Sequence, residues 1–294
     1  MPLQPIARKL FKMNDAPTLL PLRDVIAQHG LTANKSLGQH FLLDINLIGR
    51  IARAAGDLST GTTIEIGPGP GGLTRALLAA GATVIAIEKD NRFAGPLADL
   101  QAAYPERLTI VPADAMTTEI SRLGPSPRRI AANLPYNIAT ELLLQWLKDI
   151  TAFESLTLMF QREVAARIAA PPGTKAYGRL SVISQWQCDV EILFHINPRA
   201  FLPPPSVEST VVQLIPLSEP RYPASRAMLE KVTAAGFGQR RKMLRQSLMP
   251  LILGTPWDNT ESLCRFADVD PTARAETLSI EQFCKLANAI SNPP

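Results

Sequence analysis

Short hydrophobic runs alternate with segments of helical periodicity in the first part of the chain. The runs expected to be strands are 63–66, 83–87, 108–111, 129–132 and 156–160. The segments expected to be helices are 22–29, which Gly30 would end, 73–78, 140–148 and one that opens at 161–163. Strands that alternate with helices predict βαβ units and therefore a mostly parallel sheet.

The pattern changes towards the end of the chain. Residues 190–196 and 209–215 are apolar or alternating, which predicts an antiparallel pair of strands that closes the sheet. The proline-rich stretch 216–223 is typical of a linker. The signals after it are helical only, at 226–235, 242–248, 261–266 and 280–289. We therefore expect a flexible N-terminal extension (1–21), an α/β domain (22–216) and a small all-α domain (217–294).

A glycine-rich turn follows the first of these strands. Residues 67–72 read Gly-Pro-Gly-Pro-Gly-Gly and lead directly into the helix expected at 73–78. Glycines let the backbone approach a ligand closely, and the helix amino terminus points free N–H groups at it. Glu88 ends the next strand, at the distance where an acid accepts hydrogen bonds from ribose hydroxyls. The sequence thus predicts a nucleotide-type site.

A nicotinamide dehydrogenase would carry a similar fingerprint, but two details disfavour it. The prolines of the turn lack the N–H donors that cradle a pyrophosphate. Glu65 stands just before Gly67, where a carboxylate suits the ammonium group of an amino-acid moiety better than a phosphate.

Two more polar residues follow strands. Asp114 comes just past the third strand and Asn133 ends the fourth, so both are expected at the same sheet edge as Glu65 and Glu88. Each acid alone is more often a surface charge or a helix cap than a site residue. Their regular spacing favours a shared site, with Asp114 accepting from the exocyclic amine of a bound adenine.

The segment Asn133-Leu134-Pro135-Tyr136 combines a primary amide, a rigid proline and an aromatic ring. The amide oxygen and a backbone carbonyl beside Pro135 could hold both hydrogens of a planar amine such as adenine N6, whose lone pair is otherwise delocalised. Tyr136 could stack on the base, for about 1–3 kcal/mol. The alternative interpretation is an ordinary turn after a buried strand.

The chain resembles the S-adenosylmethionine-dependent rRNA adenine N6-dimethyltransferases, and most of all the bacterial small-subunit type. The resemblance covers about residues 22–290. It rests on Glu65–Gly69, Glu88, Asp114–Met116 and Asn133–Ile138, and on segments 36–42, 175–181 and 201–207. It implies a Rossmann-like class I methyltransferase fold with S-adenosylmethionine as cofactor.

The resemblance also implies roles for individual residues. The cofactor contacts would be His40, Leu42, Glu65, Gly67, Gly69, Glu88, Asp114 and Asn133. The catalytic residues would be Asn133, Leu134, Pro135, Tyr136 and Phe201, with the two aromatic rings enclosing a flipped adenine. Many family members have Asn at the position of His40. Phe201 could alternatively be a core aromatic.

The implied reaction is dimethylation of N6 on two adjacent adenosines near the 3′ end of 16S rRNA, in the 30S subunit or its precursor, with a role in subunit biogenesis. Two alternatives stay open: a large-subunit rRNA methyltransferase of the antibiotic-resistance type, and a non-catalytic relative such as a mitochondrial transcription factor. The C-terminal helices and the Phe-Leu-Pro-Pro-Pro segment at 201–205 favour the small-subunit type. Intact Glu88, Asp114 and Asn133 disfavour loss of catalysis.

Composition adds little to this interpretation. The chain has 294 residues, 46% of them hydrophobic, and a net charge of +4 with a pI near 9.1, which is compatible with an RNA partner. Basic residues cluster in a helix-like run at 239–245, which is either a solvated helix face or a phosphate-binding surface. The expected RNA contacts are Arg179, Arg240, Arg241, Lys242 and Arg245.

The remaining features concern compartment and assembly. Three widely spaced cysteines predict neither a metal site nor a disulfide framework, and no apolar run is long enough to span a membrane. Arg8, Lys9 and Lys12 precede the first acid, a weak sign of a mitochondrial presequence, but the segment is short and lacks serine. We expect a cytoplasmic monomer.

Overall fold

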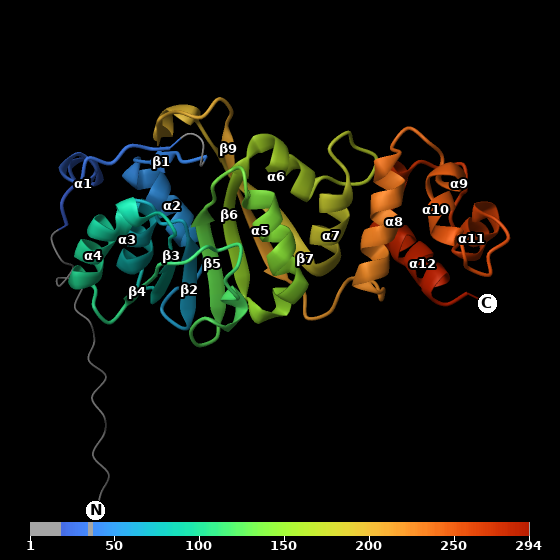
Figure 1. Cartoon of the computed structure of the whole chain (residues 1–294), viewed down its shortest axis with the longest axis horizontal. Coiled ribbons are helices and arrows are strands. Elements are labelled where there is room, and N and C mark those ends of the chain that lie inside the picture. Colours follow the sequence, from blue (N-terminus) through green and yellow to red (C-terminus); the bar gives the residue numbers. More distant parts are fainter. Residues whose placement is uncertain (1–18, 35–37, 294) are drawn as a thin grey trace, which may run out of the picture.

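The computed structural model describes residues 19–34 and 38–293, and it is built around a seven-stranded sheet (Figure 1). The strand order is β4-β3-β2-β5-β6-β9-β7. The strands are β2 (Thr62–Ile66), β3 (Val84–Ile87), β4 (Leu108–Val111), β5 (Arg128–Asn133), β6 (Ser155–Gln161), β7 (Cys188–Ile196) and β9 (Ser209–Pro216). All seven were expected from the hydrophobic pattern.

The sheet is parallel except at one side. Strands β4, β3, β2, β5 and β6 pair in parallel, whereas β9 pairs antiparallel with both β6 and β7. The expected closing antiparallel pair is therefore confirmed, and its later strand lies between β6 and β7. Because the parallel strands end at one edge, the residues that follow β2, β3, β4 and β5 gather there.

Helices cover the sheet and form one end of the molecule, where α8 to α12 lie side by side (Figure 1). The α-helices are α1 (Leu22–Gln28), α2 (Ile45–Ala54), α3 (Gly72–Ala79), α4 (Ala94–Ala103), α5 (Ala139–Trp146), α6 (Arg162–Ala169), α7 (Arg179–Gln187), α8 (Arg226–Gly238), α9 (Leu244–Ser247), α10 (Met249–Ile252), α11 (Thr260–Phe266) and α12 (Ile280–Ser291). Short 3₁₀ turns include η2 (Asn91–Phe93) and η3 (Ile120–Arg122).

A second, two-stranded sheet was not expected. Strands β1 (Phe41–Leu42) and β8 (Phe201–Leu202) pair antiparallel, with Phe41 opposite Leu202. Next to this pair, the His40 Nδ1 atom donates a hydrogen bond to the Pro203 carbonyl, 2.8 Å away. Segments that are about 160 residues apart are thus joined beside the carboxyl edge of the large sheet.

The C-terminal helices share a hydrophobic core with the α/β part. One cluster of buried side chains runs from Leu147 and Trp186 in the α/β part to Leu229 of α8 and Phe283 of α12. A boundary at 216/217 agrees with the change from strands to helices, but the two parts do not have separate cores. The division into domains therefore stays a prediction.

Some expectations lie outside the described residues. These are the basic positions near the start, residues 1–18 of the expected extension, and Ser36 and Leu37 of the segment 36–42. Within 19–34 and 38–293, no helix is both long and apolar enough to cross a membrane. The three cysteines are buried and unpaired, and no group of side chains in the described ranges is arranged to hold a metal ion.

Candidate active site

A cavity lies at the carboxyl edge of the parallel strands, under the segment that leads into β1. It is lined by the residues that follow β2, β3 and β5, by Asp114 after β4, and by residues 38–42. The predicted site residues that line it are His40, Leu42, Glu65, Gly67, Gly69, Glu88, Asp114, Asn133, Leu134, Pro135 and Tyr136. The structure therefore brings eleven predicted residues, from five separate segments, around one cavity.

The turn after β2 depends on its glycines. Gly67, Gly69 and Gly71 have φ values of +65°, +56° and +84°, which are in the left-handed region that side chains rarely adopt. A Cβ atom on Gly67 would lie 3.7 Å from the ring of Pro135, and one on Gly69 would lie 3.9 Å from Phe41. The turn therefore packs closely against the neighbouring segments and leaves its backbone open to the cavity.

Glu65 is a buried carboxyl group on the cavity wall. Only 1% of the residue is exposed, and its Oε2 atom has no hydrogen-bond partner among the described residues. Burial raises the pKa of Glu65 to about 8, although Thr74 acts in the opposite direction. An unpaired buried carboxylate is costly. A cationic donor in the cavity would relieve that cost.

Glu88 is held in a fixed orientation by the backbone. Its Oε2 atom accepts from the Gly69 amide at 3.1 Å, and its Oε1 atom accepts from the Asp90 amide at 2.9 Å. Burial raises the pKa of this carboxyl group, and the backbone donors oppose that rise. Each oxygen keeps a further lone pair. The carboxylate can therefore accept two neighbouring hydroxyl groups.

Asp114 follows β4 and faces the same cavity. Its Oδ1 atom accepts from the Met116 amide at 2.9 Å, and its Oδ2 atom is 3.2 Å from the Lys89 ammonium group. The Met116 amide, assisted by Lys89, lowers the pKa of Asp114. The group is an ionised acceptor at neutral pH, and an incoming amine would share it with a partly exposed lysine.

Asn133 is the last residue of β5, and its side-chain amide has a defined orientation. The Nδ2 atom donates to the His40 carbonyl at 3.2 Å, so the Oδ1 atom is the acceptor presented to the cavity. The Pro135 carbonyl accepts from the amides of Ile138 and Ala139 at the start of α5. Of the Leu134 and Pro135 carbonyls, which both lie beside the Pro135 ring, the Leu134 carbonyl is therefore the better candidate for a second acceptor.

Tyr136 is half-buried at the cavity wall. Its hydroxyl group shares a hydrogen bond of 2.5 Å with the Ser209 Oγ atom, which fixes the ring. The ring centroid lies 5.5 Å from that of His40, and the planes are tilted by 31°. The imidazole of His40 therefore lies beside the Tyr136 ring.

Phe201 is not on the cavity wall. The residue is 3% exposed and belongs to a cluster of buried side chains with Leu42, Ile51 and Val211. This placement fits the alternative interpretation of a core aromatic. Its expected role as a second wall for a base stays a prediction, and it would require the β1–β8 region to shift.

The basic run at 239–245 differs from the expectation of a helix with one charged face. A turn covers 239–241, Met243 bridges to Arg274, and α9 begins only at Leu244. The two ends of the run are also paired, since Arg240 lies 2.6 Å from Glu276 and Arg245 lies 3.3 Å from Glu261. Both acids are distant in sequence, so the pattern of the run itself does not reveal these ion pairs.

Four of the expected RNA contacts are exposed, and of these only Arg245 is in an ion pair with another described residue. Arg179, Arg241 and Lys242 form no side-chain ion pair with residues of the described ranges. They remain candidates for phosphate contacts.

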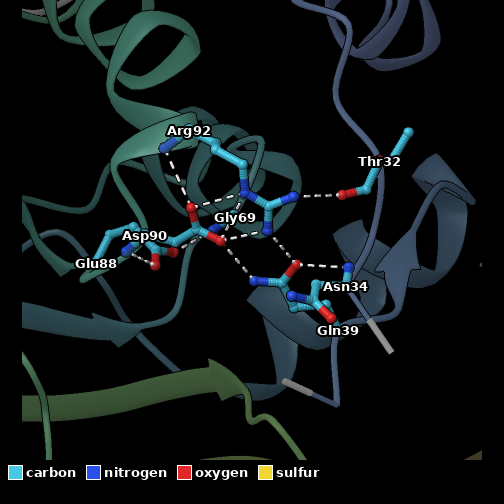
Figure 2. Close-up of polar contacts among 7 residues, drawn as sticks. All are labelled: Thr32, Asn34, Gln39, Gly69, Glu88, Asp90 and Arg92. Carbon is cyan, nitrogen blue, oxygen red and sulfur yellow. Dashed lines mark hydrogen bonds and ion pairs between the residues drawn. The ribbon is translucent and has the colours of Figure 1, made fainter. Parts of the chain in front are cut away.

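Sequence reasoning missed a polar network beside Glu88. Gln39, Asp90 and Arg92 join the segment before β1 to the segment after β3 (Figure 2). Gln39 and Asp90 line the cavity, and Arg92 does not. Gln39 lies in the segment that carries the resemblance, but no periodicity or spacing pairs it with residues about 50 positions away.

Comparison with known proteins shows which family this chain belongs to. The sequence model of the ribosomal RNA adenine dimethylases matches residues 30–292. The chain belongs to that family. It is therefore an rRNA adenine dimethyltransferase that uses S-adenosylmethionine, as the resemblance implied, and the nicotinamide dehydrogenase is excluded.

Relatives and solved structures agree with this membership. The chain is 59% identical over 273 residues to the ribosomal RNA small subunit methyltransferase A of Rhodospirillum rubrum, which covers 92% of this chain and 93% of the relative. The protein of the same name from Paramagnetospirillum magneticum is 60% identical over 279 residues, covering 95% and 96%.

Among solved structures, the dimethyladenosine transferase of Plasmodium falciparum superposes with a TM-score of 0.72 at 25% identity, covering 84% of this chain and 96% of that one. The 23S rRNA methyltransferase ErmE gives a TM-score of 0.64 at 27% identity, covering 86% and 100%. Both confirm the class I methyltransferase fold.

The residues present fit the cofactor that the family implies. The unpaired oxygen of Glu65 suits an ammonium group, the oriented carboxylate of Glu88 suits a ribose diol, and Asp114 suits an exocyclic amine. The open glycine turn between Glu65 and Glu88 leaves room for the atoms that connect these groups.

Proposed function

We propose that this enzyme dimethylates N6 of two adjacent adenosines near the 3′ end of 16S rRNA, in the 30S subunit or its precursor. The relatives at 59% and 60% identity are named as small-subunit methyltransferases, which supports the small-subunit substrate over the large-subunit alternative. The observation that carries the proposal is the Asn133 amide: its nitrogen donates to the His40 carbonyl, so its oxygen is the acceptor at a cavity wall that Leu134 and Tyr136 also line.

Each residue of the segment 133–136 has a separate role in this proposal. Asn133 Oδ1 and the Leu134 carbonyl accept the two N6 hydrogens and stabilise the positive charge that develops on the nitrogen. Pro135 stiffens the turn, and Tyr136 provides a face for the flipped base. A general base is not needed, because an N-methylated adenine ammonium is strongly acidic and loses its proton to water.

S-adenosylmethionine, when bound, supplies an electrophilic methyl group on its sulfonium centre. The chain's own residues bind and orient the cofactor: Glu65 pairs with its ammonium group, Glu88 accepts from its ribose and Asp114 accepts from its adenine amine. Gly67 and Gly69 keep the wall between these acids free of side chains. His40, just before β1, and Leu42 of β1 line the cavity as well.

The surroundings of the reaction are also part of the proposal. Arg179, Arg241 and Lys242 contact rRNA phosphates. Arg240 and Arg245 mainly stabilise the packing of the C-terminal helices through their ion pairs with Glu276 and Glu261. We propose a cytoplasmic monomer with a role in small-subunit biogenesis, and a C-terminal helical domain that begins near residue 217.

The direct test is tritiated methyl transfer to 30S particles from cells that lack this modification, followed by primer extension. We expect about four methyl groups per particle on two neighbouring adenines. Labelling of 50S particles in place of 30S particles would support the large-subunit alternative. If neither particle were labelled by a protein that still binds S-adenosylmethionine, the non-catalytic nucleic-acid-binding alternative would be supported.

Glu88→Ala is expected to raise the cofactor Kd by roughly ten- to a hundredfold, because hydrogen bonds to a charged group contribute about 1.5–3 kcal/mol. Isothermal titration with S-adenosylmethionine measures this change. Glu119→Ala is the matched control, since that acid is exposed, pairs with Arg122 and does not line the cavity. If both variants bound the cofactor equally well, the ribose assignment would be wrong.

A further inference from the structure

Arg92 donates hydrogen bonds to Thr32 and Gln39, which precede β1, and to Asp90, which like Arg92 follows β3 (Figure 2). Its Nη1 atom donates to the Thr32 carbonyl at 2.9 Å, its Nη2 atom donates to Gln39 Oε1 at 3.0 Å, and its Nε atom donates to Asp90 Oδ1 at 2.9 Å. The Nη2 atom also reaches Asp90 Oδ2. One guanidinium group therefore holds the segment before β1 against the segment that follows β3.

Further hydrogen bonds extend this arrangement. Gln39 Nε2 donates to Asp90 Oδ2 at 3.0 Å, and Gln39 Oε1 also accepts from the Asn34 amide at 2.9 Å. Arg92, Asp90 and Gln39 thus form a closed triangle in which each side chain bonds to the other two.

The geometry of the triangle sets it apart from an ordinary surface ion pair. Exposed pairs contribute little, because two flexible side chains must be ordered in water. Here the guanidinium group bonds to both carboxylate oxygens, and the Asp90 side chain is only 11% exposed. Arg92 lowers the pKa of Asp90 to about 2, so the carboxylate stays ionised at every working pH.

Asp90 and Gln39 of the triangle are each adjacent to residues that line the cavity. The Asp90 amide donates to Glu88 Oε1, and that carboxylate also accepts from Gly69. Gln39 precedes His40, whose carbonyl accepts from Asn133 Nδ2. Together with the β1–β8 pairing and the His40–Pro203 hydrogen bond, the triangle therefore holds the segment 39–42 relative to Glu88 and Asn133, although Arg92 itself does not line the cavity.

We propose that Arg92 is a positioning residue for cofactor binding: through Asp90 and Gln39 it holds residues 39–42 and the Glu88 carboxylate at the separation that the cofactor requires. This inference rests on the proposed function of the cavity. It assigns to Arg92 an effect on cofactor affinity without a contact to cofactor, rRNA or the reacting atoms.

The test measures S-adenosylmethionine affinity by isothermal titration, in the full chain without rRNA. Arg92→Ala is expected to raise the cofactor Kd roughly tenfold, with a smaller rise in Arg92→Lys, which keeps the charge but not the bidentate geometry. The rate at saturating cofactor is expected to stay within about threefold, since the reacting groups are untouched. Arg122→Ala is the matched control, because Arg122, like Arg92, lies within a short 3₁₀ turn and pairs with a nearby acid.

A double-mutant cycle separates positioning from a general loss of stability. Gln39→Ala and the double variant with Arg92→Ala are expected to have similar Kd values, because either change opens the triangle. The proposal would be overturned if the double variant raised the Kd by the product of the two single effects. An unchanged Kd in a folded Arg92→Ala protein would overturn it as well. If Arg92→Ala does not fold, the same cycle is run with Arg92→Lys.

Failure of this inference is distinguishable from failure of the proposed function. The binding measurement contains no RNA, whereas the proposed function is tested by methyl transfer to 30S particles. If Arg92→Ala has an unchanged Kd and the wild-type protein is active, only the role of Arg92 is rejected. A wild-type protein that does not bind S-adenosylmethionine rejects the assigned cofactor site, and the inference with it.

Discussion

Asn133→Ala is expected to lower the rate of methyl transfer by about two to three orders of magnitude, the usual effect of removing one group that stabilises developing charge. The Asn133 oxygen faces the cavity because its amide nitrogen donates to the His40 carbonyl. Alanine removes that acceptor and also frees the His40 carbonyl. The rate at saturating cofactor and 30S substrate should therefore fall, while rRNA binding should change little.

Single-turnover methylation and a filter-binding measurement on the same 30S preparation separate these two effects. Asn259→Ala is a matched control, because it removes an asparagine that caps α11, far along the chain from the cavity. It should cost about 1 kcal/mol of stability and leave the methylation rate unchanged. An Asn133→Ala protein with wild-type activity would remove Asn133 from the mechanism.

The central sheet was predictable because its strands are short runs, apolar or alternating between apolar and polar residues, that lie between turn signals. Strands β2 and β6 are almost completely buried, although β2 reads Thr-Thr-Ile-Glu-Ile and β6 also contains Ser and Thr. Their isoleucine, leucine and threonine content is typical of strands. The four strand ends then had to meet at one edge, since parallel strands share their direction. This is why Glu65, Glu88, Asp114 and Asn133 could be placed together before any coordinates were known.

Features that depend on contacts between distant segments could not be predicted in this way. Strands β1 and β8 are two residues long and show no periodicity, and each exists only because the other pairs with it. The basic run at 239–245 has a helical pattern, but backbone hydrogen bonds from Leu244 to Ala273 and from Arg245 to Pro271 delay the start of α9. Tertiary contacts outweighed local propensity there.

The same reasoning applies to the site. Tyr136 follows a strand and was found by its local motif, whereas the Ser209 hydroxyl that fixes its ring lies on β9. Phe201 lies in segment 201–207, which resembles the family, but its burial depends on the β1–β8 pairing, which the sequence does not show. Motifs therefore located the residues that face the cavity better than the residues that hold them in place.

Cofactor affinity is expected to rise with pH up to about pH 8 and then to fall. Burial raises the pKa of Glu65 to about 8, so the carboxyl group is mostly protonated in the free protein at pH 6–7. An ammonium group beside Oε2 favours the carboxylate, so binding in this range releases a proton. Affinity should therefore increase by up to about tenfold per pH unit. Above about pH 8 the amine of the cofactor loses its own proton and the trend reverses.

The same shift has the opposite effect on the stability of the free protein. Its folded state binds the Glu65 proton more tightly than the unfolded state does, so this stabilising contribution is complete below the normal pKa of 4.5 and is lost as pH rises towards 8. Glu65→Gln keeps the shape without the titration. At pH 8 we expect this variant to unfold at a higher temperature than the wild-type protein, although it binds the cofactor more weakly.

Titration calorimetry in two buffers of different ionisation enthalpy counts the protons directly. At pH 7 the wild-type protein should release about one proton per S-adenosylmethionine bound, and Glu65→Gln should release none. Glu119→Gln is again a suitable control, because that carboxyl group is exposed and does not line the cavity. A wild-type affinity that stays constant between pH 6 and pH 8 would show that Glu65 is not the partner of the ammonium group. Its unpaired oxygen would then need another donor, and the cofactor would have to lie differently along the glycine turn.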